Sequence, residues 1–441
     1  MSSPITSNIV IIGGGLAGLT LALSLHQRGI PCTIYEARPE SASTPGALML
    51  SPNSLRILDR LGIYAHIRSQ GYNFQTVAFK NAAEETTDLY HLGGTAHYDY
   101  DCLRLYRQTL LLALRAAAAA ANIPIHYSHK FSHIITPTDP STNAITFALT
   151  TPGTPLTTTT LTASLLIAAD GIHSKLRTTH VAPSALATYA NTLAITFATS
   201  RARALLPATH PTSPVAIHGP RGAFVLAPQS ADGVSALLAG TQVANYPEQT
   251  RAGWEELGKD EERLVGMLRG EGWEGGVDGD GGGVGEKADA WPPTVRAALR
   301  DIPRDSLAIW PYYSVPRLES WADERARVVV VGDAAHAIPP TAGQGASQAL
   351  EDAVTLAEVV GEFEGGAGEG EWAAAVGRWH RYRQGRVDRV VELTRRLNNT
   401  RLPAEERAKL GEGEVWKSGG EGELAWLYNA DVVEELRAFE G

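Results

Sequence analysis

Residues 332–345, with the sequence GDAAHAIPPTAGQG, combine a carboxylate with a turn whose backbone N–H groups could bind a ligand. Four valines at 328–331 predict a buried strand before this segment, and the pattern at 346–360 predicts a helix after it. Asp333 would therefore lie at the carboxyl end of a strand, where it can accept hydrogen bonds from sugar-like hydroxyls. The turn opens onto a helix N-terminus, whose free N–H groups attract negative charge. The segment thus predicts a binding site for a polar, negatively charged ligand.

A second strand, glycine turn and helix occur near the start of the chain. An apolar run at 9–12 precedes a Gly-x-Gly-x-x-Gly turn, and a helical stretch leads to a second apolar run at 32–35, which ends at Glu36. The glycines of the turn are Gly13, Gly15 and Gly18. Such glycines let the backbone approach a pyrophosphate at the helix N-terminus, and the acid can hold ribose hydroxyls. The pattern predicts a dinucleotide site, and it does not distinguish FAD from NAD.

Two shorter signals lie between these segments. Asp170-Gly171 follows the apolar run 165–167, and Arg107 begins an Arg-x-x-Leu sequence that leads into an alanine-rich helical stretch. An Asp-Gly pair alone is usually an ordinary turn, and a single arginine at a helix start is often only solvated. Their meaning therefore depends on the company of the two glycine-rich segments.

Taken together and in this order, the four segments resemble the group A FAD-dependent monooxygenases, the aromatic hydroxylase superfamily that includes p-hydroxybenzoate and salicylate hydroxylases. The resemblance implies non-covalent FAD as the cofactor. The glycine turn would lie at the pyrophosphate, Glu36 at the ribose, Arg107 near the central linker, Asp333 at the ribityl chain and Pro340 at the flavin's edge. The full set of implied cofactor-binding residues is Gly13, Gly15, Leu16, Ala17, Gly18, Glu36, Ala37, Arg38, Gly46, Ala47, Arg107, Asp170, Gly171, Asp333, Pro340, Gly343, Gly345 and Ala346.

The same resemblance implies the fold: an α/β protein with a Rossmann-type FAD-binding domain, an interleaved antiparallel β-sheet domain for substrate, and C-terminal helices. We expect the FAD domain to be discontinuous and to comprise residues 1–80, 100–182 and 325–371. The β-rich substrate domain would take 81–99 and 183–324, and the C-terminal helical region 372–441. Strand-like patterns in these parts lie at 145–148, 161–167, 193–198, 215–218, 223–226 and 234–240.

The resemblance also implies the reaction. In that family NAD(P)H reduces FAD, O2 adds at flavin C4a, and the hydroperoxide delivers one oxygen atom to an electron-rich substrate. We therefore expect a hydroxylase or epoxidase of a small aromatic or polyketide-like molecule. A flavin oxidase or dehydrogenase without oxygen insertion is the main alternative. A flavin halogenase is disfavoured, because the sequence lacks the Trp-x-Trp-x-Ile-Pro segment that those enzymes carry. An FAD-binding protein without turnover is disfavoured by the intact Asp170-Gly171 and Gly332-Asp333 pairs.

No catalytic base can be assigned from the sequence. Polar candidates in or near the expected substrate sheet are His218, Arg221, Gln229, Tyr246, Tyr312 and Tyr313. We expect Phe197, Phe224 and Leu226 to form apolar walls of the substrate cavity. His336 falls within the cofactor motif, so we expect it to be structural. The absence of a second Gly-x-Gly-x-x-Gly leaves NADH and NADPH both open as co-substrates.

Composition excludes several other classes. The chain has 441 residues, 44% of them hydrophobic and 20% charged, which is ordinary for a globular protein. A net charge of −10 disfavours a general nucleic-acid partner. Cys32 and Cys102 cannot form a disulfide framework, no Cys/His spacing suggests a metal site, and no apolar stretch is long enough to span a membrane. We therefore expect a cytoplasmic enzyme. The glycine-rich composition of residues 270–285 separately predicts a flexible loop there.

Overall fold

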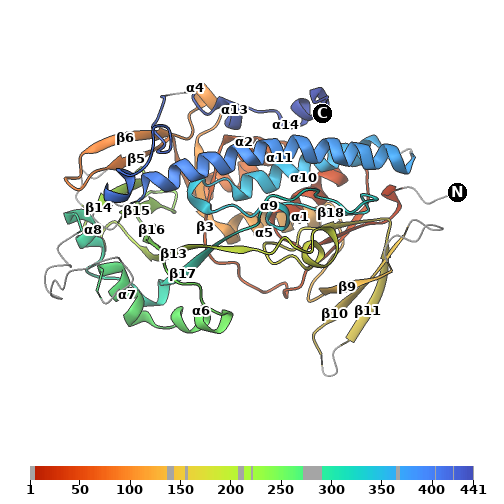
Figure 1. Cartoon of the computed structure of the whole chain (residues 1–441), viewed down its shortest axis with the longest axis horizontal. Coiled ribbons are helices and arrows are strands. Elements are labelled where there is room, and N and C mark those ends of the chain that lie inside the picture. Colours follow the sequence, from red (N-terminus) through yellow and green to blue (C-terminus); the bar gives the residue numbers. More distant parts are fainter. Residues whose placement is uncertain are drawn as a thin grey trace.

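The computed structural model describes residues 5–136, 144–153, 157–206, 213–219, 222–271, 291–363, 368–402, 404–420 and 422–440 (Figure 1). Most of the glycine-rich run 270–285 lies outside these residues, so the loop expected there remains a prediction. Arg221 lies outside them as well.

A five-stranded parallel sheet carries the motifs that the sequence analysis identified. Its strand order is β18 (Val328–Val330), β12 (Leu165–Ala168), β1 (Ile9–Ile12), β2 (Cys32–Tyr35) and β8 (Ile125–His126). The residues of β1, β12 and β18 are all buried, as expected for parallel strands covered on both faces. The predicted Rossmann-type domain is confirmed. Because the strands are parallel, the turns that follow β1, β12 and β18 meet at one edge of the sheet.

Three long helices pack around this sheet. They are α1 (Leu16–His26), α5 (Arg107–Ala120) and α10 (Gly345–Glu362), and α1 packs against both α5 and α10. The 32-residue helix α11 (Glu369–Thr400) runs beside α10 across the molecule (Figure 1). One face of α11 packs inward, since Trp372, Val376 and Trp379 are buried in the core. None of the described helices is both long enough and apolar enough to cross a membrane.

Two small antiparallel sheets flank the parallel one. The first contains β9 (Lys130–Thr136), β10 (Ile145–Thr151) and β11 (Thr157–Ala163), and the second has the order β3 (Ala47–Leu50), β7 (Cys102–Tyr106), β4 (Tyr72–Phe74). The strand expected at 161–167 is in fact two strands of different sheets, divided at Ser164. The Ser164 hydroxyl donates to the carbonyl oxygen of Ile5 at 2.6 Å, which fixes this change of direction.

A seven-stranded sheet forms the other half of the molecule. Its order is β17 (Ala308–Ser314), β13 (Thr188–Thr199), β16 (Leu237–Ala244), β15 (Gly222–Pro228), β14 (Val215–Gly219), β5 (Thr76–Lys80) and β6 (Thr86–His91). All neighbours are antiparallel except β14 and β5. The expected domain boundaries remain a prediction. Residues 76–80, which are expected in the FAD domain, form β5 and pair within this sheet.

The two faces of the seven-stranded sheet have different partners. One face packs on α6 (Arg251–Leu257), α7 (Glu261–Arg269) and α8 (Pro293–Ala298) in a separate apolar core. Phe197, Phe224 and Leu226 belong to that core, so their assignment as walls of the substrate cavity is wrong. Side chains alternate along a strand, and it is Val225 and its same-face neighbours that line the cavity.

Short elements complete the chain. The helices are α2 (Pro52–Arg60), α3 (Tyr64–Ile67), α4 (Thr95–Tyr98), α9 (Asp333–His336), α12 (Ala404–Arg407), α13 (Ala425–Tyr428) and α14 (Val432–Ala438). Single turns lie at η1 (Ile5–Ser7), η2 (Arg68–Gln70), η3 (Arg177–Val181), η5 (Arg304–Ser306) and η6 (Pro340–Ala342).

Candidate active site

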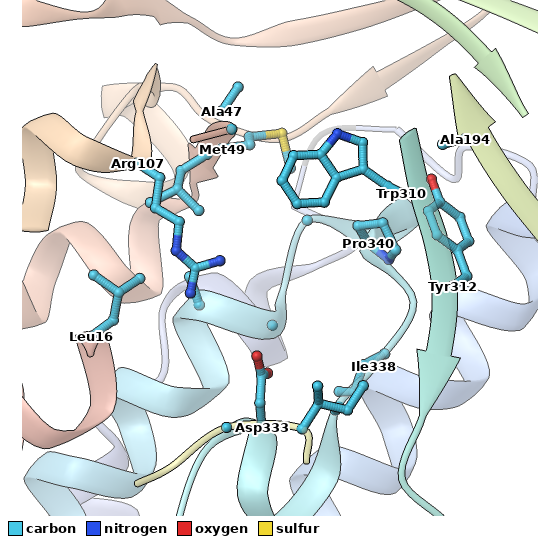
Figure 2. Close-up of a pocket in the computed structure, with 18 of the residues that line it drawn as sticks. Leu16, Ala47, Met49, Arg107, Ala194, Trp310, Tyr312, Asp333, Ile338 and Pro340 are labelled. Carbon is cyan, nitrogen blue, oxygen red and sulfur yellow. The ribbon is translucent and has the colours of Figure 1, made fainter. Parts of the chain in front are cut away.

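A cavity of about 1160 Å³ lies between the carboxyl edge of the parallel sheet and the seven-stranded sheet. All of the cofactor-binding residues expected from the sequence line it except Gly18. Segments from the start, middle and end of the chain therefore meet around one space, part of which Figure 2 shows.

Gly18 has a different role from the other glycines of its turn. A Cβ at Gly18 would lie 2.0 Å from the carbonyl oxygen of Gly13, so Gly18 lets α1 pack closely on the turn. Gly13 itself has a φ of +113°, and a Cβ there would lie 2.2 Å from the carbonyl oxygen of Ala169. By contrast, a Cβ at Gly15 meets no atom within 4 Å, because Gly15 faces the cavity. The turn thus leaves room for a ligand at Gly15 and at the N-terminus of α1.

This difference makes Gly15 a test of the cofactor site. Gly15 has a φ of −85°, which alanine adopts readily, so Gly15→Ala should leave the melting temperature of the cofactor-free protein unchanged. The added methyl group would occupy the space of a pyrophosphate, so we expect FAD to bind about tenfold more weakly, a loss of about 1.4 kcal/mol. Fluorescence titration of the cofactor-free protein with FAD measures this change.

Gly385→Ala is the matched control, because Gly385 lies within α11 and a Cβ there also meets no atom within 4 Å. It should leave FAD binding unchanged. Equal FAD affinity in Gly15→Ala and wild type would show that the cofactor does not approach this turn.

Glu36 follows β2 and is buried at the cavity wall. Its Oε2 accepts a 2.7 Å hydrogen bond from the backbone N–H of Gly14, and its Oε1 accepts one of 2.9 Å from the N–H of Arg38. These contacts fix the carboxylate in one orientation. A carboxylate has about four acceptor positions, so Glu36 retains capacity for a ribose hydroxyl.

Asp170 lies at the end of β12, facing the same space. Its Oδ2 accepts a 3.0 Å hydrogen bond from the N–H of Lys175, whereas its Oδ1 is buried and has no hydrogen-bond partner among the residues that the structure describes. Burial raises the pKa of this carboxyl group, and hydrogen bonds from Ser174 and nearby backbone oppose that shift. A buried acceptor without a partner is costly, so Oδ1 marks a position where a ligand donor would be stabilised.

The turn after β18 carries Asp333 into the cavity. Gly332 has a φ of +61°, and the Asp333 carboxylate makes no hydrogen bond or ion pair with the residues that the structure describes. Figure 2 shows Asp333 and Arg107 pointing into the same open space, with Pro340 beside it. Gly343, at φ +65°, ends η6, and α10 begins at Gly345 with its N–H groups toward the cavity.

A network of buried charged residues on α10 and α11 holds the turn at Gly332 in place. Asp352 on α10 accepts a 2.8 Å hydrogen bond from the N–H of Gly332 and contacts His336 Nε2 at 2.6 Å. Arg383 on α11 donates to Asp352 at 2.8 Å and to Glu351 at 2.5 Å, and both carboxylates are fully buried. His336 is thus hydrogen-bonded to Asp352, which agrees with the structural role expected for it.

The network makes the stability of the protein depend on pH. Burial raises the pKa of Glu351, but the charges of Arg386 and Arg383 and hydrogen bonds outweigh burial and lower it to about 2. A depressed folded-state pKa stabilises the protein above the unfolded value of 4.5, and this contribution is lost as the pH falls through about 2. The difference in free energy of unfolding between wild type and Glu351→Gln should therefore shrink as the pH falls from about 5 toward 2. Urea denaturation at several pH values measures it, and a difference independent of pH would contradict this role.

The donors and acceptors around the cavity fit an FAD molecule. Two helix N-termini, those of α1 and α10, face the cavity with their backbone N–H groups. Arg38, Arg107 and Lys175 supply positive charge, and Glu36 and Asp333 supply acceptors for hydroxyl groups. This combination matches a ligand that carries phosphates in its middle and sugar hydroxyls on either side.

The rest of the cavity lies against the seven-stranded sheet and is mainly apolar and aromatic. Its walls include Val77, Phe79, Tyr90, Leu92, Ala194, Val225, Leu238, Trp310, Tyr312 and Leu397. Of the described polar candidates, only Tyr312 and Tyr313 line it. His218 is bound through both ring nitrogens to the carbonyl oxygens of Lys80 and Thr400, and Gln229 is buried outside the cavity.

Sequence reasoning missed several lining residues. Trp310 is 39% exposed and lines the cavity (Figure 2). A Cβ at Gly46 would lie 3.3 Å from its ring. Arg104 interrupts the apolar strand β7, which is a signal that could have been noticed, whereas nothing in the local sequence marks Arg401. Gln242 lines the cavity as well and donates to the Tyr312 hydroxyl at 3.0 Å.

Known proteins resemble this chain along nearly its whole length. The family described as "FAD binding domain" matches residues 6–262 and 302–394. A 3-amino-4-hydroxybenzoate 2-monooxygenase of Streptomyces platensis is 27% identical over 448 residues, which cover 96% of each chain. Solved structures of CtdE with FAD and a substrate, and of a salicylate hydroxylase substrate complex, have TM-scores of 0.73 and 0.71 at 17% and 20% identity. Each covers 98% of this chain and is itself covered to 97%.

Proposed function

The chain belongs to the FAD binding domain family and is a group A FAD-dependent monooxygenase, and we propose that it uses NAD(P)H and O2 to hydroxylate or epoxidise a small electron-rich aromatic or polyketide-like substrate. The observation that supports this most is that one cavity contains both the FAD motifs and an aromatic-walled part against the seven-stranded sheet. We call this part, which is lined by Phe79, Tyr90, Trp310 and Tyr312, the substrate chamber. A cofactor at the motifs would face a molecule held against the seven-stranded sheet.

Bound FAD would supply the redox chemistry, because it can accept a hydride from NAD(P)H and activate O2. The residues of the chain bind and orient it. Gly15 and the N-terminus of α1 would bind the pyrophosphate, Glu36 the adenosine ribose, and Asp333 the ribityl hydroxyls. The N-terminus of α10 would lie at the pyrimidine side of the ring, where its positive end stabilises negative charge on reduced flavin.

The substrate side of the cavity favours an aromatic molecule. Four aromatic residues line it, namely Phe79, Tyr90, Trp310 and Tyr312. Aromatic walls stabilise a planar apolar ring by contact area and by aromatic pairing. The named relative acts on an aminohydroxybenzoate, which is an electron-rich ring, and this supports the same substrate class here. We assign no catalytic base.

Flavin reduction tests this proposal directly. The FAD-loaded protein should oxidise NADH or NADPH slowly alone and at least several-fold faster when a suitable phenol is added. Stopped-flow absorbance of the flavin under anaerobic conditions measures the reduction step apart from the oxygen reaction. A protein that binds FAD but is not reduced by either nucleotide would contradict the proposed co-substrate.

A further inference from the structure

Two arginine side chains from distant parts of the chain, Arg104 and Arg401, line the substrate part of the cavity. Arg104 lies on β7 between Leu103 and Leu105, which are fully buried in the core below. Alternation along the strand therefore directs Arg104 to the other face, where it lines the cavity. Its Nε donates to the carbonyl oxygen of Pro228 at 3.2 Å, and no described group accepts a hydrogen bond from the terminal nitrogens of its guanidinium group.

Arg401 reaches the same chamber from the end of α11, where it is the C-terminal capping residue. Its side chain makes no hydrogen bond or ion pair with the residues that the structure describes. The described carboxylates that line the cavity are Glu36, Asp170 and Asp333, and all three belong to the cofactor motifs. Neither arginine forms an ion pair with a described acid.

This arrangement is energetically unfavourable without an anion. Burial, with a further contribution from the charge of Arg401, lowers the pKa of Arg104 to about 10, and burial also lowers the pKa of Arg401. Guanidinium groups in proteins keep their charge at neutral pH. The cavity therefore holds two positive charges with no described counter-charge beside them. Buried charges in proteins are normally paired, because an unpaired charge in a low-dielectric site is costly.

Tyr312 adds a neutral donor to the two arginines. Its hydroxyl oxygen accepts the hydrogen bond from Gln242, so its own proton is directed elsewhere, and no described group accepts it. Burial raises the pKa of Tyr312, which keeps this proton in place. Figure 2 shows the Tyr312 ring standing on β17 beside Ala194, another cavity residue.

We propose that Arg104 and Arg401, with the Tyr312 hydroxyl, bind a carboxylate on the aromatic substrate and so select an aromatic acid over its neutral analogue. The guanidinium group suits this ligand, because its planar donors match the two oxygens of a carboxylate. The proposal rests on the proposed function for the identity of the ring, but the anion site itself is independent of the oxygen chemistry. These residues are specificity determinants that hold one end of the substrate.

Binding titrations with paired acids and amides test the proposal without turnover. The FAD-loaded protein is titrated with 4-hydroxybenzoate and 4-hydroxybenzamide, and with 6-hydroxy-2-naphthoate and its amide, while the flavin absorbance is followed. We expect at least one acid to bind tenfold or more tightly than its amide. If no acid binds more tightly than its amide, the proposal is wrong, even when FAD binding and NAD(P)H oxidation are intact.

Substitutions test which residues cause the preference for the acid over its amide. Arg104→Met with Arg401→Met should bring the acid-to-amide affinity ratio close to one while FAD content stays normal. Arg401→Met alone, at a helix end, should reduce the ratio partially and guards against misfolding of the double variant. Arg395→Met is the control, because Arg395 lies on the same helix but is exposed and paired with Glu392 and Glu414. If the double variant keeps the wild-type acid-to-amide affinity ratio, the assignment of Arg104 and Arg401 as the carboxylate site is wrong. If the wild-type protein does not bind FAD at all, the proposed function is contradicted instead.

Discussion

Asp333→Ala is expected to bind FAD about 100-fold more weakly than wild type. Asp333 points into the cavity and has no partner among the described residues, so its acceptor atoms are free for the ribityl hydroxyls. Hydrogen bonds to a charged group contribute about 1.5–3 kcal/mol, and about 2.7 kcal/mol corresponds to this loss. The purified variant should lose most of its yellow colour, and titration of the cofactor-free protein with FAD gives the affinity.

Asp333→Asn separates charge from shape, because it keeps one acceptor oxygen in the same place. It should bind FAD with an affinity between those of wild type and Asp333→Ala. The cofactor-free forms of all three proteins should melt at nearly the same temperature. Wild-type affinity in Asp333→Ala would show that this residue does not contact the cofactor.

The second large effect is expected on stability. Arg383 on α11 is completely buried and donates to Glu351, Asp352 and Gln348, so Arg383→Met removes the guanidinium group that two buried carboxylates share. Arg386 still donates to Glu351, and His336 still contacts Asp352. Removing one partner of a buried ion pair costs about 3–5 kcal/mol. We expect the free energy of unfolding to fall by that amount, as measured by urea denaturation of the cofactor-free protein. FAD affinity should fall as well, because Asp352 fixes the N–H of Gly332.

Arg395→Met serves as the control on the same helix. Arg395 is 46% exposed, and exposed ion pairs contribute only about 0–1 kcal/mol. A similar small loss in Arg383→Met would mean that the core adjusts around the missing guanidinium, and the network would then not account for the position of the Asp333 turn.

The turns of the cofactor site could be predicted from sequence because each is a local feature. A buried strand, a glycine and a helix start are contiguous in the chain, and the parallel arrangement of β1, β12 and β18 brings their turns to one edge. Gly18 is the instructive exception. It belongs to the same motif, but it faces the Gly13 carbonyl group and not the cavity.

The substrate chamber could not be predicted in the same way. Which face of a strand lines a cavity depends on what packs on the other face, and Phe224 turned out to face the helices while Val225 faces the chamber. Arg104 and Arg401 are nearly 300 positions apart in the chain. They come together only because α11 ends against the seven-stranded sheet. Local patterns contain no information about such a contact.

Oxygen insertion is the central claim, and isotope labelling tests it most directly. The FAD-loaded protein is supplied with NAD(P)H, 18O2 and a series of phenolic acids, and products are analysed by mass spectrometry. For any compound that accelerates NAD(P)H oxidation, we predict a product that carries one 18O atom. Hydrogen peroxide formed in equal amount to the oxidised NAD(P)H, with no labelled product from any accelerating compound, would contradict the monooxygenase reaction and favour a flavin oxidase.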